Sequence, residues 1–394
     1  MPKKKAKAAL TFPGPLQRQI RLDVDPASWK GKPAPPRLAA LHGRQCSVSM
    51  TRVLAAIPIC TAPLTGYGFE LSQFWAHLRY GPALGAGPGL RLRPEWSDID
   101  SHQKTILSDD FGMGVPWVIL TRALRLKRLV PTQFILDGLV SIGSAKVSAA
   151  ARDKRGQFKS PDFIGIGQDG KLHVLECKGT QSADGIRKAL PRGREQKANL
   201  LIEPKARRGE ALVSALYVPQ HEGGSPRCLI VDPEAPENEE VSVISPRPGE
   251  IERIAAQWEI AAGLHVLGAT FEAASVARGE WTGDARASMA EQEHTWGTRQ
   301  ELGAPLRTRS FVVRFPSPLE EQGERLVGIR AEVGLDARIV EKLMTESVAS
   351  AVESARVSGE HRSILMMRTP DRAAILTAAG VYSSIEILRR VPTE

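Results

Sequence analysis

The stretch SPDFIGIGQDGKLHVLECKGT, residues 160–180, decides how the fold of this chain is interpreted. Two patterns overlap in it. The letters GIGQDGK, which end at Lys171, match the G-x-x-x-x-G-K spacing of a loop that wraps a phosphate group. Asp162, Glu176 and Lys178 match instead the spacing of two carboxylates and a lysine that gather round a divalent cation. The two interpretations require different backbones, so the neighbouring residues distinguish between them.

The phosphate-loop interpretation fails on the residues that follow the lysine. Such a loop needs a Ser or Thr directly after its lysine, and a helix whose N-terminus faces the phosphates. Here Leu172 follows Lys171, and the letters LHVLECKG have the composition of a β-strand with no helix start. The stretch is therefore interpreted as a β-hairpin.

The hairpin makes a geometric prediction about the charged residues. A three-residue turn that ends at Gly170, with this glycine in the left-handed conformation, places Asp162 directly opposite Glu176. Opposed residues share a face of the sheet, with their β-carbons about 5 Å apart. Lys178 lies two residues beyond Glu176 and so points the same way. The spacing predicts that all three side chains meet on one face.

The apolar residues of the hairpin support this register and predict burial. One face carries Ile164, Ile166, Leu172 and Val174, and the other carries Phe163, Leu175 and Cys177. A strand pair that is apolar on both faces is typical of a sheet covered by helices on both sides. Burying three charged groups there costs several kcal/mol unless the charges compensate one another, which a bound cation would help to do. The alternative is a buried salt bridge of Lys178 with one carboxylate, or partial exposure of all three at a sheet edge.

These residues resemble a known nuclease signature. Pro161-Asp162 resembles the PD element, and Glu176-Cys177-Lys178 resembles the (D/E)xK element, of the PD-(D/E)xK nuclease superfamily. The elements expected between residues 98 and 232 also resemble the α-β-β-β-α-β core of its restriction-endonuclease-like fold. The fold class expected is thus α/β, with a mixed sheet flanked by helices.

The resemblance implies a metal-dependent hydrolysis. It implies that Asp162 and Glu176 bind Mg²⁺, which Mn²⁺ can replace, and that the backbone carbonyl of Cys177 is a further ligand. It also implies that Lys178 orients or deprotonates the attacking water. These roles agree with the chemistry of a divalent cation, which lowers the pKa of its bound water and stabilises charge on the scissile phosphate.

A further acidic residue is expected on the helix before the first core strand. Members of the superfamily often carry one there, and the letters SDDFGMG offer Asp109 and Asp110. Neighbouring residues on a helix point about 100° apart, so only one of the two can face the site. Asp110 is our choice as a catalytic residue and metal ligand. The alternative is that Ser108 or Asp109 caps the helix.

The helix after the E-x-K strand offers another candidate. Superfamily members often place a Gln or a basic residue on this helix, and Gln196 occupies such a place at the end of a helix expected from about residue 183 to 201. Pro191 and Gly193 are expected to break or delay that helix. Gln196 is therefore either an active-site residue or a surface or capping residue.

The same segment is strongly basic. The chain has a formal net charge of +9, and between residues 185 and 208 eight basic residues face only two acidic ones. Such a run favours a polyanionic partner, although it is also typical of a solvated helix face. The residues expected to contact nucleic acid are Arg187, Lys188, Arg192, Arg194 and Lys197.

Three regions are expected along the 394 residues. Residues 1–97 form an N-terminal region with a basic tail and an irregular, Pro- and Gly-rich α/β part. Residues 98–235 form the nuclease core, in which the helix at residues 98–126 is expected to be interrupted by Gly112, Gly114 and Pro116, and a weak strand is expected near residues 145–151. Residues 236–394 form a mainly α-helical C-terminal region, a candidate surface for protein partners or target recognition.

The sequence also limits the compartment. No apolar stretch is long enough for a membrane helix, and none resembles a secretory signal. We therefore expect a cytoplasmic location and no membrane association. The four cysteines are scattered, which indicates neither a disulfide framework nor a zinc site.

The leading functional hypothesis is a Mg²⁺-dependent deoxyribonuclease. A setting in a bacterial or phage-related defence or restriction system follows from the resemblance and not from any residue. One alternative is an inactive nuclease fold that binds nucleic acid and acts with a partner. Another is an RNA-directed nuclease, because phosphate contacts do not distinguish DNA from RNA. Target sequence, endonuclease or exonuclease action, and oligomeric state are not encoded in any recognisable pattern.

Overall fold

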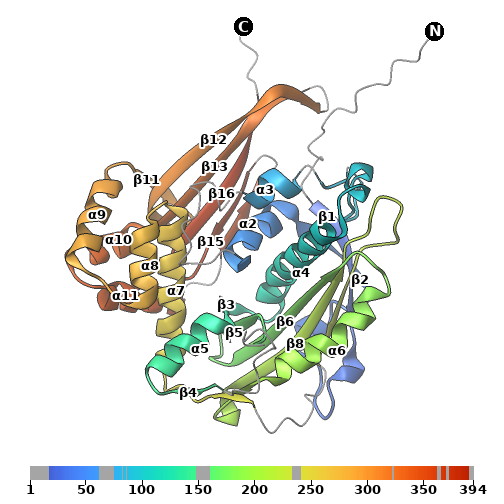
Figure 1. Ribbon diagram of the computed structural model, residues 1–394, viewed down its shortest axis with the longest axis horizontal. Helices are drawn as coiled ribbons and strands as arrows, with labels where there is room; N and C mark the ends of the chain where they lie inside the picture. Colours follow the sequence, from blue (N-terminus) through green and yellow to red (C-terminus); the bar gives the residue numbers. More distant parts are fainter. Residues whose placement is uncertain are drawn as a thin grey trace.

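The computed structural model describes residues 17–61, 75–81, 83–85, 87–147, 160–232, 241–321, 324–361, 365–369 and 372–389. Within these ranges the chain is a mixed α/β protein, built on a seven-stranded, a six-stranded and a three-stranded sheet. Figure 1 shows the seven-stranded sheet with its helices in one half of the molecule, and the six-stranded sheet with a second group of helices in the other half.

The seven-stranded sheet combines strands from distant parts of the sequence. In spatial order its strands are β2 (Arg44–Ser49), β1 (Gln17–Val24), β9 (Arg227–Val231), β8 (Arg208–Tyr217), β6 (Leu172–Thr180), β5 (Phe163–Gly167) and β3 (Leu126–Pro131). The pairs β6–β8 and β1–β9 are parallel, and the other pairs are antiparallel. The expected boundary after residue 97 therefore does not divide the packing, because β1 pairs with β9 and continues the sheet. The remaining short elements of the N-terminal region are η1 (Pro26–Ser28), α1 (Pro36–Ala39) and η2 (Pro94–Ser97).

Helices cover both faces of this sheet, as the apolar pattern predicts. On one face lie α2 (Met50–Thr61) and α4 (Ser101–Ala123), and on the other lie α5 (Thr132–Ser141), α6 (Gly185–Ala198) and α7 (Glu250–Val266). The short helix α3 (Trp75–Tyr80) packs against α2. The two sets of hairpin residues separate as predicted: Phe163, Leu175 and Cys177 lie in the cluster that includes α2 and α4, and Ile164, Ile166, Leu172 and Val174 lie in the cluster that includes α5 and α7.

The long helix α4 is continuous, so the expected interruption is wrong. It begins after Asp100, whose side chain accepts hydrogen bonds from the N–H groups of His102 and Gln103, and it runs through both glycines and Pro116. A β-carbon on Gly114 would lie 3.1 Å from the Val53 carbonyl oxygen of α2. A glycine at this position thus allows α2 to pack closely against α4. The N-cap is Asp100, so neither Ser108 nor Asp109 caps the helix.

The first strand of the core is not the one expected. The weak strand near residues 145–151 reduces to β4 (Ala145–Lys146), and its part from residue 148 onward lies outside the described residues. β4 joins β10 (Ser242–Ile244) and β7 (Leu200–Ile202) in the three-stranded sheet. The core strand is instead β3, whose letters LKRLVP directly follow α4. Its partner β5 is distant in sequence, which explains why local pattern did not reveal it.

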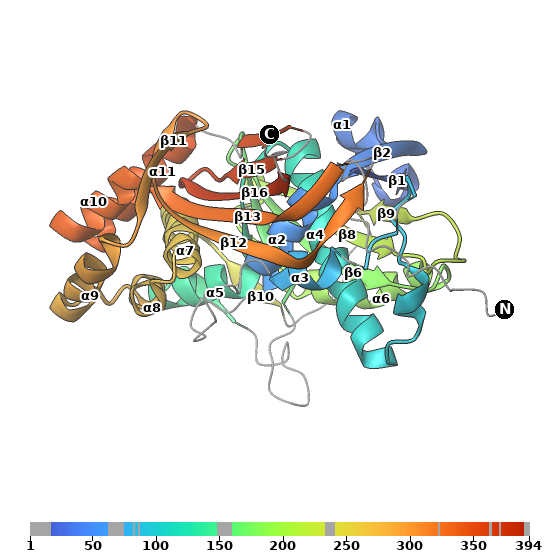
Figure 2. The ribbon, with the colours of Figure 1, turned by 90° about the horizontal axis from the view of Figure 1, so that it is seen from above.

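The C-terminal region contains as much sheet as helix, which corrects the expectation of a mainly helical region. Its helices after α7 are α8 (Thr270–Arg278), α9 (Gly283–Glu293), α10 (Ala337–Thr345) and α11 (Val348–His361). Its strands, in spatial order, are β11 (Gly297–Glu301), β12 (Ala304–Glu321), β13 (Glu324–Asp336), β16 (Val381–Arg389), β15 (Arg372–Leu376) and β14 (Leu365–Arg368). Figure 2 shows β12 and β13 as a long bent ribbon across the molecule. The letters RSFVVRF, residues 309–315, indicate a strand within β12, and pairing with β13 extends this strand to Ala304–Glu321 through the flanking proline residues.

The C-terminal region packs directly on the core. Ile254 and Trp258 of α7 lie in the same buried cluster as Val130 of β3 and Ile135 of α5. The expected boundary at residue 235 is therefore also crossed by packing.

The short helix η4 (Lys205–Arg207) precedes β8. Among the helices of the described ranges, none has both the length and the apolar character needed to cross a lipid bilayer.

Candidate active site

The hairpin of β5 and β6 has the register that the sequence predicts. Gly170 adopts a positive φ of 76° in the turn, and the N–H of Gly167 donates to the carbonyl of Lys171 at 2.8 Å. Further along, Ile164 pairs with Val174 and Phe163 with Leu175. The next position along β5 is Asp162, which the register places opposite Glu176.

Asp162 and Glu176 hold each other's strand in place. The backbone N–H of Cys177 donates to Oδ2 of Asp162 at 2.7 Å, and the backbone N–H of Asp162 donates to Oε2 of Glu176 at 3.2 Å. Glu176 is fully buried, whereas Asp162 is half-buried. The two carboxylates thus lie together at the end of β5, with one of them shut away from water.

Lys178 brings a positive charge to this pair. Its ammonium group forms an ion pair with Oε1 of Glu176 and donates a hydrogen bond to Oε1 of Gln196 at 2.6 Å. The Lys178 side chain remains 23% exposed, while that of Glu176 is inaccessible. The ammonium therefore lies at the boundary between the buried carboxylate and solvent.

The electrostatics of the three groups are strongly coupled. Burial, and then the charge of Asp162, raise the pKa of Glu176 to about 8. Burial also raises the pKa of Asp162, although the charge of Lys178 offsets part of the rise. Burial alone would lower the pKa of Lys178, but the charges of Glu176 and Asp162 raise it above its ordinary value. Two carboxylates and one ammonium leave a site that attracts further positive charge.

Gln196 reaches the site because α6 is continuous, which corrects the expectation that Pro191 and Gly193 break it. A β-carbon on Gly193 would lie 2.5 Å from Cγ1 of Val213 and 3.3 Å from Cγ of Glu176. The glycine therefore lets α6 approach the sheet beside Glu176, and Gln196 then lies within reach of Lys178. The Gln196 side chain therefore contacts Lys178. The alternative considered for it was a surface or capping role.

Of the two neighbouring aspartates, Asp109 and not our choice of Asp110 is coupled electrostatically to Lys178 and Asp162. Asp110 is buried and accepts a hydrogen bond from the Tyr80 hydroxyl. Asp109 instead lies within electrostatic reach of the site: desolvation raises its pKa, and the charge of Lys178 counteracts that rise. The charge of Asp109 in turn contributes to the raised pKa of Asp162, after burial. The rotation of α4 about its axis, set by packing, decides between them.

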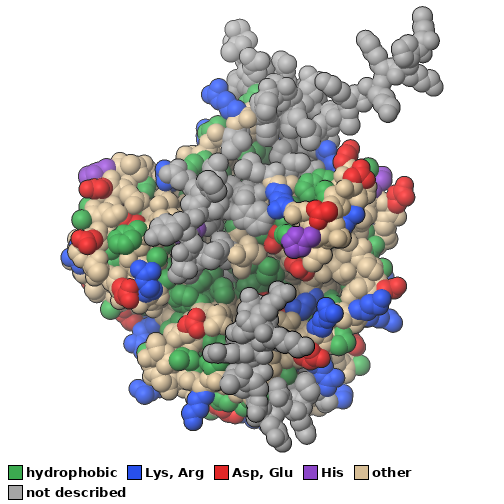
Figure 3. Space-filling view, in the orientation of Figure 1, with side chains coloured by type: hydrophobic (Ala, Val, Ile, Leu, Met, Phe, Trp, Pro, Cys, Tyr) green, Lys and Arg blue, Asp and Glu red, His purple; other side chains and the backbone are tan. Residues whose placement is uncertain are grey.

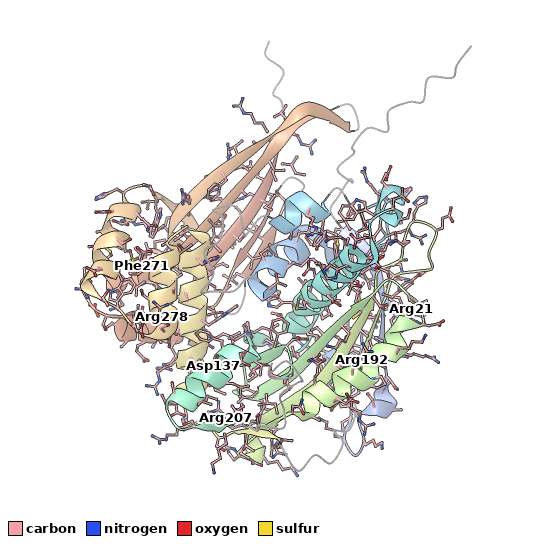
Figure 4. The ribbon with its side chains drawn as sticks, in the orientation of Figure 1. Arg21, Asp137, Arg192, Arg207, Phe271 and Arg278 are labelled. Carbon is pink, nitrogen blue, oxygen red and sulfur yellow. The ribbon has the colours of Figure 1, made fainter. Side chains whose placement is uncertain are left out.

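The basic residues of α6 divide into two groups. Arg187, Lys188, Arg192 and Arg194 are exposed, and Figure 3 shows Lys and Arg side chains on the surface over α6. Figure 4 labels Arg192 on this helix. Lys197 is only 5% exposed, and the expectation that it contacts nucleic acid is wrong.

Lys197 has partners within the protein in place of a phosphate. Its ammonium donates to the Ala211 carbonyl at 2.7 Å and to Oδ1 of Asp232 at 3.1 Å. A sequence signal for this existed, because Ile186, Gly193 and Lys197 follow the i, i+7, i+11 spacing of one helix face. All three are buried against the sheet.

Two supporting residues were not anticipated from the sequence. Ser214 of β8 is inaccessible to solvent, and its hydroxyl donates to the Glu176 carbonyl at 3.3 Å. Gly179 follows Lys178 and lies against the Ser108 carbonyl of α4. Neither belongs to a recognisable motif, since both act through contacts with elements distant in sequence.

The donor set fits a magnesium ion. Among the described residues, no group of three or more His, Cys, Asp and Glu side chains gathers as in a fully protein-ligated metal site. Mg²⁺ does not require one, since it keeps several waters and commonly uses one or two carboxylates. Asp162 and Glu176 supply two hard oxygen donors whose mutual repulsion a divalent cation would relieve. The Cys177 carbonyl fits as well, because a strand residue directs its N–H and C=O to the same side, and the Cys177 N–H points to Asp162.

Comparisons with family models, with curated proteins and with solved structures find no match to this chain. The functional assignment therefore depends on the geometry of the site itself.

Proposed function

We propose that this protein is a Mg²⁺-dependent nuclease of the PD-(D/E)xK type that hydrolyses phosphodiester bonds of DNA. The observation that carries the proposal is the buried carboxylate pair of Asp162 and Glu176, with Lys178 and Gln196 joined to it. Such a cluster destabilises a fold unless a cation compensates it, so its presence is better explained by function than by stability.

The order of elements around the site supports the same proposal. Helix α4 is followed by the three antiparallel strands β3, β5 and β6, then by α6, and then by β8 parallel to β6. This order resembles the α-β-β-β-α-β core of restriction-endonuclease-like proteins, with α5 as an addition between the first two strands. Catalytic groups at the end of the second and third strands are what the resemblance implies.

In this proposal each residue has a distinct task. Asp162 and Glu176, with the Cys177 carbonyl, would hold Mg²⁺, which when bound supplies a water of lowered pKa and neutralises charge on the phosphate. Lys178 would orient the attacking water or deprotonate it, as the resemblance implies, from its place beside Glu176 and Gln196. Gln196 holds the Lys178 side chain in position.

The exposed side chains of α6 suit the backbone of a nucleic acid. Arg187, Lys188, Arg192 and Arg194 all lie on the helix that also carries Gln196. Contacts from these residues to phosphates would position the strand without reading its sequence. The assignment to DNA in a bacterial or phage-related defence or restriction setting remains part of the proposal, and it comes from the resemblance.

One observation favours a second candidate, a nucleic-acid-binding protein without catalysis. The ion pair of Lys178 with Glu176 already compensates one buried charge without a metal. In that case the cluster would be a structural salt bridge and α6 the binding surface. An RNA-directed nuclease shares all the features of the leading proposal and differs only in substrate.

The decisive experiment compares cleavage with and without metal. Supercoiled plasmid, linear duplex, single-stranded DNA and RNA are incubated with the protein in Mg²⁺, in Mn²⁺ or in EDTA. The matched variants are Asp162→Asn and Glu176→Gln, with Glu195→Gln as the control because Glu195 is an exposed carboxylate next to Gln196. We expect metal-dependent cleavage by the wild type and the control, and none by the two site variants.

Each other outcome has a defined meaning. Binding to nucleic acid without cleavage in either metal would overturn the enzyme and support the binding protein. Cleavage of RNA alone would reassign the substrate. Full activity of Asp162→Asn or Glu176→Gln would place the catalytic site elsewhere.

A further inference from the structure

A cavity lies away from the proposed active site, on the side of the molecule where β2 ends the seven-stranded sheet. Its volume is about 500 Å³, and it lies between the edge strand β2, helix α1, the start of α2 and the last turns of α4. Cavities of this size are in the range of small-molecule sites. Because α4 rises about 1.5 Å per residue, the cavity residue Arg122 lies about 20 Å along the helix from Asp109.

The floor of this cavity is apolar and continuous with the main core. Leu22 of β1, Val48 of β2, and Val118 and Ile119 of α4 line it, and each is at most 9% exposed. They belong to the same buried cluster beneath α2 and α4. An apolar floor of this kind suits the uncharged part of a ligand.

The walls, in contrast, are basic. Three arginines from three different helices line the cavity: Arg37 of α1, Arg52 in the first turn of α2 and Arg122 in the last turns of α4. No Asp or Glu is present among the described residues that line it. Like charges repel, so their convergence around one cavity favours an anionic occupant. Arginine is the residue best suited to bidentate contacts with phosphate.

Neutral polar groups complete the lining. Cys46, Ser47, Val48 and Ser49 are consecutive residues of β2, and all four border the cavity. Since β2 is the last strand of its sheet, this edge presents N–H and C=O groups of the strand backbone. The register with β1 puts the Ser47 and Ser49 hydroxyls on the face opposite Val48, and the Ser47 hydroxyl donates to the amide oxygen of Gln17. A ligand here therefore meets backbone donors and acceptors beside the apolar floor.

We propose that this cavity binds a nucleoside phosphate. The apolar floor would take the base, the backbone edge of β2 would bond its polar groups, and the arginines would hold the phosphate. A phosphate monoester carries about two negative charges at neutral pH, which matches a three-arginine wall better than the single charge of a fatty acid. A sugar phosphate would leave the apolar floor without a partner.

The test measures binding in EDTA, so that the proposed metal site does not take part. Titration calorimetry of the full chain uses the four common nucleoside 5′-monophosphates, the matching nucleosides, inorganic phosphate and a 5′-phosphorylated dinucleotide. The variant is Arg37→Gln/Arg122→Gln, since both arginines are exposed and their loss should not disturb folding. Arg278→Gln, an exposed arginine of α8 outside both the cavity and α6, is the control.

We expect at least one monophosphate to bind, and to bind at least about tenfold more tightly than its nucleoside and than inorganic phosphate. The double variant should weaken it by about tenfold or more, and the control should not. If the dinucleotide binds as tightly as the monophosphate or more tightly, the ligand is the 5′ end of a nucleic-acid strand. If it binds more weakly, the ligand is a free nucleotide.

Three results would overturn the proposal: no heat with any monophosphate, equal affinity for inorganic phosphate, or binding that survives the double variant. Because no metal or cleavage is involved, failure here is distinguishable from failure of the proposed nuclease function.

Discussion

Gly112 of α4 and Gly179 of β6 lie so close together that a β-carbon on Gly112 would stand 2.7 Å from the α-carbon of Gly179. In the same contact, a β-carbon on Gly179 would collide with the Ser108 carbonyl of α4. Gly179 directly follows Lys178, so this contact fixes where the strand that carries the lysine meets the helix that carries Asp109. The glycines thus contribute to the site without touching a substrate.

Gly179→Ala is expected to destabilise the protein strongly. Its β-carbon would meet backbone atoms, which cannot turn away as a side chain can, and overpacking of this kind costs about 1–3 kcal/mol or more. Gly283→Ala is the control, because a β-carbon there meets nothing within 4 Å. The free energy of unfolding in denaturant measures both. Equal stability of the two variants would show that α4 and β6 are not held this closely.

The raised pKa of Glu176 predicts an unusual pH dependence of stability in EDTA. The ordinary pKa of this carboxyl is 4.5, and in the folded protein it is about 8. Between these values the folded state binds more protons than the unfolded state, so the free energy of unfolding should fall as pH rises and level off above about pH 8. The raised pKa of Asp162 contributes to the same fall in the free energy of unfolding.

Glu176→Gln tests this dependence. The variant should lose most of the fall between pH 5 and pH 8, because the amide does not ionise. Addition of Mg²⁺ to the wild type at pH 8 should restore stability, since a ligand of the folded state stabilises it. A variant with the same pH slope as the wild type would show that Glu176 ionises with an ordinary pKa.

Lys178 and Gln196 should act as a unit in turnover. Lys178→Ala is expected to lower the single-turnover cleavage rate by about 10²- to 10⁴-fold, as loss of an electrostatic stabiliser does, while Mg²⁺ still binds. Gln196→Ala should lower the same rate less, because it only removes the partner at 2.6 Å that positions the ammonium. Calorimetric Mg²⁺ titration separates the two roles: a collapse of metal affinity in Lys178→Ala would make the lysine structural.

The two classes of basic residue on α6 should respond differently to salt. Replacing Arg187, Lys188, Arg192 and Arg194 together by Gln should flatten the plot of log affinity against log salt by about one unit per lost phosphate contact. Lys197→Met should lower stability, since it leaves Asp232 without this buried partner, and should leave the slope unchanged. Both are measured on duplex DNA in an Asp162→Asn background, so that the substrate survives. An unchanged slope in the fourfold variant would show that these side chains of α6 are solvated and contact no phosphate.

A buried ion pair joins the core to the C-terminal region. Arg128 of β3 and Glu259 of α7 meet at 2.8 Å, and Arg128 also donates to the Ala355 carbonyl of α11. Arg128→Met should cost about 3–5 kcal/mol because it strands a buried carboxylate, and Arg128→Met/Glu259→Met should regain part of that loss. The exposed pair of Arg330 with Glu386 is the control, and Arg330→Met should cost at most about 1 kcal/mol. Denaturant unfolding measures all three, and equal losses would contradict a packed interface here.

The hairpin and its charged residues were predictable because their geometry is local. A turn glycine and the two-residue period of a strand suffice to place Asp162 opposite Glu176, and the structure has that register. The basic run was also visible in the sequence. Its side chains could not be sorted by charge alone, although the helical spacing of Ile186, Gly193 and Lys197 already marked the buried face.

What only the tertiary structure decided depends on contacts between distant segments. The pairing of β1 with β9, and of β12 with β13 and β16, follows from which strands meet, and local patterns that predict a strand do not show its partner. The different surroundings of Asp109 and Asp110 follow from the rotation of α4, which its glycines set by packing on β6 and α2. The sequence by itself therefore determined the chemistry of the hairpin, because two-residue periodicity and a turn fix it within about twenty residues. The surrounding sheet, the orientation of α4 and the basic cavity beside β2 were decided by packing, because the free energy of a non-local contact depends on both partners and not on either sequence segment alone.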